Sequence, residues 1–145
     1  MASIGGPKIL VGHGYGGMLI SHAGCVERGT RALVFVAAFA PDCGESIADL
    51  MVDAPGTGAG GDPGGLFTAD PAWKHLPTWF VYGEADTVIP PTLHAWMAAR
   101  AGAVASAVVP GAGHDLIAEQ PVEVLRVIRQ AVDATMAQQP NSAPD

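Results

Sequence analysis

Two side chains that could exchange a proton follow apolar runs in the second half of the sequence. Asp86 comes shortly after the run at residues 79–82, and His114 comes shortly after the run at residues 104–109. Because the carboxyl ends of parallel strands share one edge of a sheet, we expect both side chains at that edge. A carboxylate that fixes the tautomer of an imidazole makes that imidazole a general base. The pair could therefore take a proton from a nucleophile.

The place where such a nucleophile would sit lies near the start of the chain. Residues 12–16, which we call the elbow, read G-H-G-Y-G after the apolar run 9–11 and before a segment of helical spacing. This is the context of the G-x-S-x-G turn, in which a strand turns sharply into a helix and lifts a nucleophile above the sheet. Here Gly14 occupies that position and has no side chain. The order along the chain, elbow then acid then base, is nevertheless that of a Ser-acid-His triad.

The elements that must position these residues alternate between strand and helix. The apolar runs 9–11, 32–36 and 79–82 and a weaker one at 104–109 are continuous, which is typical of parallel strands covered on both faces. Each of the first, third and fourth runs is followed by apolar residues at helical spacing: Leu19, Ala23 and Val26; Leu93, Trp96 and Met97 after Pro91; and Leu125, Ile128, Val132 and Met136 after Pro121. We predict an α/β domain over residues 1–137, with about four parallel strands, flanking helices and right-handed crossovers.

Two stretches fall outside this pattern. Residues 55–65 carry six glycines and two prolines, which predicts a loop between the second and third strands. They contain no G-K-[ST] phosphate-binding sequence, and we expect no cofactor. The polar residues 138–145 are expected to form a flexible tail.

Composition excludes several classes of function. The chain has 145 residues, of which 49% are hydrophobic, enough for one core. Its net charge of −7 disfavours binding to nucleic acid or to anionic membranes, and no apolar run approaches the roughly 18 residues of a membrane span. Cys25 and Cys43 form no C-x-x-C pair and follow no secretory signal, so we expect a cytoplasmic protein with both thiols buried. The spacing of His22, His75 and His94 predicts no metal site.

Four stretches together resemble the α/β-hydrolase superfamily, in particular its small esterase and hydroxynitrile-lyase-like branch. They are VGHGYGGMLIS, RALVFVAAFAPDCGES, PAWKHLPTWFVYGEADTVIPP and GAGHDLIAEQP, and they span more than half of the chain. The resemblance implies a partial α/β-hydrolase fold with Asp86 as the acid and His114 as the base. It also implies Gly14 at the nucleophile position, the Tyr15 backbone amide as an oxyanion-hole donor, and a small ester-like ligand.

The sequence departs from that family in three ways. Gly14 removes the attacking hydroxyl, without which no acyl-enzyme can form. The family takes a second oxyanion amide from a segment ahead of the elbow, and this sequence begins just before the elbow. The loop at 55–65 stands where the family has a helical cap. We therefore expect a relative of carboxylesterases with impaired catalysis. The alternative is an active hydrolase or lyase in which the Asp86–His114 pair works on a water or a substrate hydroxyl.

The remaining candidates have structural interpretations. His13 is expected to pack below the turn, Asp115 to lie in a loop or cap a helix, and the tryptophans 73, 79 and 96 to line the core or a pocket. The first strand has no partner for one of its edges, and an apolar unpaired edge favours association with another strand. We therefore expect the chain to form a homodimer, or to aggregate, through the exposed edge of residues 9–11.

Overall fold

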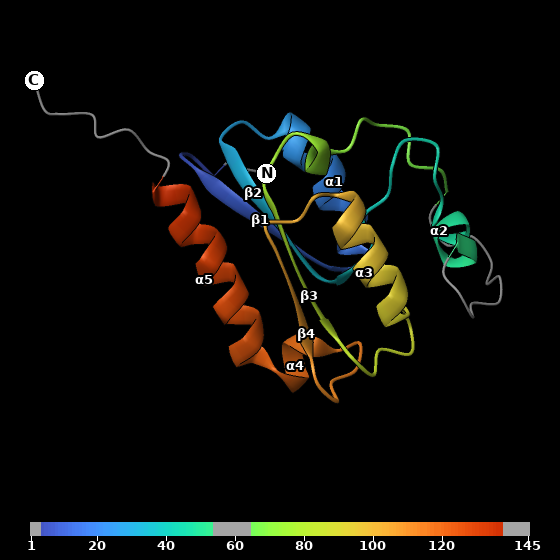
Figure 1. The fold of residues 1–145 in the computed structure, drawn as a ribbon. Helices are drawn as coiled ribbons and strands as arrows, with labels where there is room; N and C mark the ends of the chain where they lie inside the picture. Colours follow the sequence, from blue (N-terminus) through green and yellow to red (C-terminus); the bar gives the residue numbers. More distant parts are fainter. Residues whose placement is uncertain (1–3, 54–64, 138–145) are drawn as a thin grey trace, which may run out of the picture.

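The computed structural model describes residues 4–53 and 65–137 and contains one four-stranded parallel sheet in the order β1-β2-β3-β4 (Figure 1). The strands are β1 (Lys8–Gly14), β2 (Thr30–Ala38), β3 (Thr78–Gly83) and β4 (Ala105–Val109). The helices are α1 (Gly16–Val26), α2 (Ile47–Asp53), α3 (Pro91–Arg100), α4 (Leu116–Glu119) and α5 (Pro121–Ala137), with a 3₁₀ turn at Ala72–Lys74. The predicted architecture of four parallel strands with flanking helices is confirmed. Apart from Gly65, the predicted loop at 55–65 and the predicted tail at 138–145 lie outside the described residues.

Helices cover both faces of the sheet, which explains why its strands are continuously apolar. In β2, Leu33 and Phe35 belong to the core layer under α1 and α3, whereas Val34 and Val36 belong to the layer under α5. Figure 1 shows α5 on one side of the sheet and α1 and α3 on the other. Successive residues of a strand point to opposite faces. Both sets must therefore be apolar.

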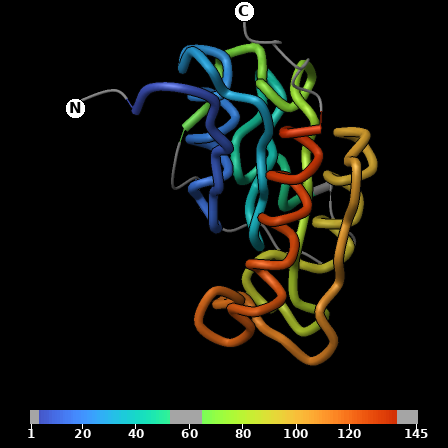
Figure 2. Tube along the Cα trace, turned by 90° about the vertical axis from the view of Figure 1, so that its left-hand side faces the viewer, coloured from blue at the N-terminus to red at the C-terminus, as the bar shows by residue number. Residues whose placement is uncertain are grey.

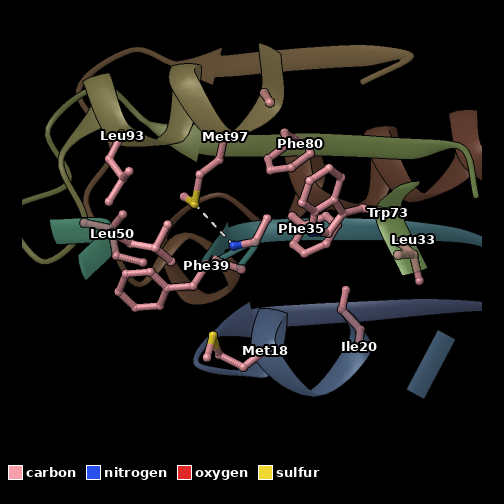
Figure 3. Packing of buried hydrophobic residues seen from close by; sticks show 14 of the residues in the cluster. Met18, Ile20, Leu33, Phe35, Phe39, Leu50, Trp73, Phe80, Leu93 and Met97 are labelled. Carbon is pink, nitrogen blue, oxygen red and sulfur yellow. Dashed lines mark hydrogen bonds between the residues drawn. The ribbon is translucent and has the colours of Figure 1, made fainter. Parts of the chain in front are cut away.

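The core layer under α3 also holds the segment that follows β2. Phe35 and Phe80 stack with their ring centroids 4.7 Å apart. Beside them the Met97 sulfur accepts a hydrogen bond from the Ala40 amide at 3.2 Å (Figure 3). Trp73 adds a second tie, because its indole N–H donates to the Pro41 carbonyl at 2.8 Å. The chain leaving the carboxyl end of β2 is thus fixed next to the elbow.

In two helices, α1 and α5, several of the apolar residues predicted to face the core are exposed, and other residues are buried in their place. In α1 the buried residues include Gly17 and Ser21, while Leu19 is 60% exposed. The helix uses its small residues to approach the sheet, since a Cβ on Gly17 would lie only 2.0 Å from the Phe39 carbonyl oxygen. In α5 the buried residues are Val124, Val127 and Ala131, and of the predicted stripe Leu125, Val132 and Met136 are exposed.

Two further expectations were wrong about burial. Cys25 and Cys43 are exposed, with Cys25 near the end of α1 and Cys43 in the turn after β2. Trp96 is 42% exposed and lies against the Arg100 guanidinium, 4.3 Å from the ring centroid, so it is not a core residue. Among the residues that the structure describes, no helix is long and apolar enough to cross a membrane.

The outer edge of β1 has no partner strand among the described residues. Figure 2 looks onto α5, with β1 in dark blue beside it at the margin of the sheet. Val11 of β1 is 41% exposed. A groove of about 390 Å³ runs between the start of β1 and the end of α5 and is lined by Pro7, Ile9, Val132 and Met136, among others. The edge therefore combines unpaired strand backbone with apolar side chains.

We propose that a second copy of the chain pairs with this edge. Sedimentation at increasing concentration should then show a monomer–dimer equilibrium. Val11→Lys should weaken it about tenfold or more, because a lysine on an edge strand must leave water when another strand pairs there. Val26→Lys, at an exposed position at the end of α1, is the matched control and should change nothing. A chain that stays monomeric at high concentration would contradict the proposal.

Candidate active site

The elbow is a tight connection from β1 to α1. Gly14, the last residue of β1, has φ +57°, in the left-handed region that glycine adopts without strain. Gly12 is needed for a different reason, because a Cβ there would lie 2.6 Å from the Gly16 carbonyl oxygen. The turn is thus closed so tightly that strand and helix backbones touch.

The contact at Gly12 predicts a large loss of stability on a small substitution. Gly12→Ala should lower the free energy of unfolding by about 2 kcal/mol, because the methyl group has only backbone to displace. Gly16→Ala is the matched control: a Cβ there meets nothing within 4 Å, and alanine favours the helix by up to about 1 kcal/mol. Urea unfolding of both variants measures the difference. Equal stabilities would show that the elbow can open.

A bulge in β2 supports the elbow from its neighbouring strand. His13 pairs with Val36 but Gly14 pairs with Ala38, so Ala37 is an extra residue, and it has φ +42°. Past the bulge, the Phe39 amide donates to the Gly14 carbonyl at 3.1 Å. The backbone of Gly14 is therefore fixed by its pairing with β2 and by the residue that follows that strand.

The acid and the base come from two loops that are hydrogen-bonded to each other. After β3, the Glu84 amide donates to the Val109 carbonyl and the Ala85 amide to the Ala112 carbonyl, both at 2.9 Å. These bonds tie the turn that follows β3 to the turn that follows β4. They bring Asp86 beside the loop that carries His114, although the two residues are 28 positions apart.

Four donors surround the Asp86 carboxylate, whose side chain is fully buried. Its Oδ1 accepts the amides of Val88 and Ile89 at 2.9 Å each, and its Oδ2 accepts His94 Nε2 and His114 Nδ1 at 3.0 Å each. Burial alone would raise the pKa of Asp86, but the hydrogen bonds from the two imidazoles and the two amides outweigh it and hold the pKa well below its usual range. The group therefore stays a carboxylate and accepts from both rings.

This arrangement determines the proton positions on His114. A carboxylate can only accept, so His114 donates from Nδ1, and in the neutral ring the lone pair is then on Nε2. That Nε2 faces the elbow: a Cβ built on Gly14 would lie 3.4 Å from it. The structure therefore brings together three of the four residues singled out from the sequence, namely Gly14, Asp86 and His114.

The fourth residue, Tyr15, lies at the start of α1. It is the N-cap of the helix, where the first amides have no acceptor within the helix and point outward. The residue is 45% exposed and lines a groove of about 240 Å³ with Leu19, His22, Phe67 and other residues. The amide of Tyr15 is thus adjacent to Gly14, and an apolar groove opens beside it.

Two histidines contact this constellation in ways that the sequence analysis did not identify. His13 donates from Nε2 to the His114 carbonyl at 2.9 Å, with the two rings 4.9 Å apart, so it holds the loop that carries the base. His94, considered above only as a metal ligand, is 1% exposed and contacts Asp86. Burial is the largest influence on the pKa of His94 and, with a smaller contribution from His114, lowers it despite the raising effect of the Asp86 carboxylate, which favours the neutral ring. A histidine between apolar residues at helical spacing was the only sequence signal for this contact.

The other candidates lie elsewhere. His75 pairs with Asp70 on the surface, and Asp115 occupies the N-cap position of α4 without a capping hydrogen bond from its side chain. Trp73 and Trp79 are buried, as expected. Within residues 4–53 and 65–137, no three His, Cys, Asp or Glu side chains are grouped so as to hold a metal ion.

Comparisons with known proteins agree with the fold. A family model described as the alpha/beta hydrolase family matches residues 52–127, just over half of the chain. A search of curated proteins finds no match. Among solved structures, polyneuridine aldehyde esterase is 19% identical with a TM-score of 0.63, and the match covers 91% of this chain and 74% of that one.

Two other solved structures are similar to a comparable extent. A pyrethroid hydrolase from Sphingobium faniae is 17% identical with a TM-score of 0.64, covering 92% of this chain and 74% of the other. A methylesterase from Arabidopsis is 13% identical with a TM-score of 0.64, covering 89% and 70%. At these identities the likeness concerns the fold, whereas the family model reports on the sequence itself. The chain belongs to the alpha/beta hydrolase family.

Proposed function

We propose that this protein is an esterase-type hydrolase scaffold that keeps the acid and base of an acyl-transfer triad and lacks its nucleophile. The observation that carries the proposal is the 3.4 Å between His114 Nε2 and the Cβ position of Gly14. A hydroxyl on that carbon would lie within reach of the imidazole. The ester class is supported by the names of two similar structures, an esterase and a methylesterase.

The chemistry explains why the native chain is expected to be impaired. In acyl transfer, a hydroxyl oxygen bonds to the acyl carbon while its proton passes to His114 Nε2, and the carbonyl oxygen takes up negative charge near the Tyr15 amide. The alcohol then leaves with that proton, and water repeats the sequence to release the acid. Gly14 offers no oxygen for the first bond. The native chain should therefore bind a small ester without forming an acyl-enzyme.

Covalent labelling tests this assignment directly. A serine-directed fluorophosphonate should label Gly14→Ser at position 14, as seen by mass spectrometry of the peptides. It should leave the native chain and Gly14→Ala unlabelled. Adding His114→Ala to Gly14→Ser should slow labelling strongly, because the base is gone. Labelling at position 14 that does not depend on His114 would contradict the proposed triad geometry.

A second candidate function is hydrolysis by water activated directly by the Asp86–His114 pair. Its support is that the nearest atoms to the Cβ position of Gly14 are Nε2 and Cε1 of His114, so a small nucleophile there would meet the base first. General-base help of this kind contributes about 100- to 10000-fold. The native chain would then hydrolyse p-nitrophenyl acetate above the buffer rate, and His114→Ala would abolish that excess.

A further inference from the structure

His94 is a buried imidazole that the acyl-transfer chemistry does not use. It lies in the first turn of α3, and its ring stacks on that of Tyr82 with the centroids 4.7 Å apart. Its exposed fraction is 1%, whereas the His114 side chain is 23% exposed. Of the two rings that donate to Asp86, His94 is therefore the one held rigidly by the core.

The two oxygens of Asp86 are held by different parts of the fold. Oδ1 is bound by two amides of its own turn, whereas Oδ2 is bound only by side chains, His94 and His114. Rotation of the carboxylate about its Cβ–Cγ bond would move both oxygens, so the donors to Oδ2 resist it together with the two amides at Oδ1. Of the two donors to Oδ2, His94 lies on a helix packed against the core, whereas His114 lies in a loop.

We propose that His94 is a positioning residue for the Asp86–His114 pair: its Nε2–H holds Oδ2 in the direction that keeps His114 in the Nδ1–H tautomer. Because burial keeps the His94 ring neutral, it adds a hydrogen bond without placing a positive charge beside His114. The groups that face this ring are the Tyr82 ring, the Asp86 carboxylate and His114. The consequence for catalysis rests on the proposed function, whereas the effect of His94 on the tautomer of His114 does not depend on any activity.

Two substitutions separate the hydrogen bond from the shape of the ring. His94→Phe keeps a ring that can stack on Tyr82 and removes the donor, whereas His94→Gln keeps an N–H near the position of Nε2. In nitrogen-15 NMR of the otherwise native chain, the His114 Nδ1–H signal should be sharp in the native chain and in His94→Gln. In His94→Phe it should broaden, with exchange into water about tenfold faster. His75→Phe, which removes a surface imidazole paired with Asp70, is the matched control.

The same His94 substitutions can be combined with Gly14→Ser, and their effect on kcat and KM can then be measured. In Gly14→Ser, His94→Phe should lower kcat about tenfold and leave KM unchanged. The partner that orients a ligand contributes about 10- to 100-fold at metal sites, and His94 orients Asp86 in the same way. His94→Gln should restore most of the rate. If Gly14→Ser proves inactive, the proposed function fails, while the NMR result on His114 still decides the role of His94.

Three results would overturn the inference. Equal behaviour of His94→Phe and His94→Gln would mean that only the volume of the side chain matters. An unchanged His114 signal in a folded His94→Phe would mean that the donor is dispensable. Should His94→Phe fail to fold, the native chain itself decides, because finding His94 in the Nδ1–H tautomer would exclude a bond from Nε2 to Asp86.

Discussion

Gly14→Ser is expected to give an esterase that turns over p-nitrophenyl acetate about a thousandfold faster than the native chain. Removing the nucleophile of a complete serine triad costs about a millionfold in kcat. The site proposed here has one oxyanion donor among the described residues, the Tyr15 amide, and lacking one such donor costs about 100- to 1000-fold. The gain should therefore fall well short of the full value of the nucleophile. A burst of p-nitrophenol equal to the enzyme concentration would show that an acyl-enzyme accumulates.

The backbone conformation at position 14 determines how much stability the gain in activity of Gly14→Ser costs. At φ +57° a side chain that replaces hydrogen is strained by about 1–2 kcal/mol, so Gly14→Ser should unfold at a lower temperature than the native chain. Gly14→Ala is the matched control, since it carries the same strain and the same Cβ without a hydroxyl. Turnover by Gly14→Ala as fast as by Gly14→Ser would show that residue 14 is not the acylated position.

Asp86→Asn, introduced into Gly14→Ser, is expected to lower kcat about 10000-fold while the protein remains folded. The substitution keeps an oxygen for the amides of Val88 and Ile89 and replaces the other by an NH₂ group, which donates. Both imidazoles must then accept. His114 would turn into the Nε2–H tautomer and point a proton, in place of a lone pair, at the new hydroxyl. Nitrogen-15 chemical shifts of His114 report this change independently of activity.

Asp86→Ala should behave differently, because it removes the acceptor without supplying a partner. The amides and imidazoles around it would stay buried without their acceptor, which should cost about 1–3 kcal/mol in the free energy of unfolding for each donor left unsatisfied. Urea unfolding of the two Asp86 variants separates these effects. A stable Asp86→Ala would mean that water readily reaches the buried donors.

The same carboxylate predicts a dependence of stability on pH. The pKa of Asp86 is lower in the folded chain than in the unfolded one, so its stabilisation is complete above the unfolded pKa of about 4 and is lost as the pH falls towards the folded value. Asp86→Asn should remove this component of the acid sensitivity. The free energy of unfolding, measured between neutral pH and pH 3, therefore falls less steeply in Asp86→Asn than in the native chain.

The strands could be predicted because their signal is local. Continuous apolar runs require a sheet covered on both faces, and the order of runs and helical segments leaves few topologies. The helix faces could not be predicted in this way. Leu19 belongs to the most obvious apolar stripe of α1, but the helix buries Met18 and Ile20 instead. Its close approach to Phe39 requires glycine at position 17. The burial of the cysteines was misjudged for a related reason, as residue type alone does not say which way a side chain points.

The sequence by itself determined the order of the candidate site residues along the chain. Gly14 lies in the elbow, Asp86 follows the third strand and His114 follows the fourth. The carboxyl ends of parallel strands must meet at one edge, so these positions follow from the chain alone. Only the tertiary structure decided what faces each atom. That Asp86 Oδ2 is shared by His94 and His114 depends on how α3 packs over a loop eight residues earlier in the chain. No spacing encodes that contact, because it is set by the burial of the whole helix against the sheet.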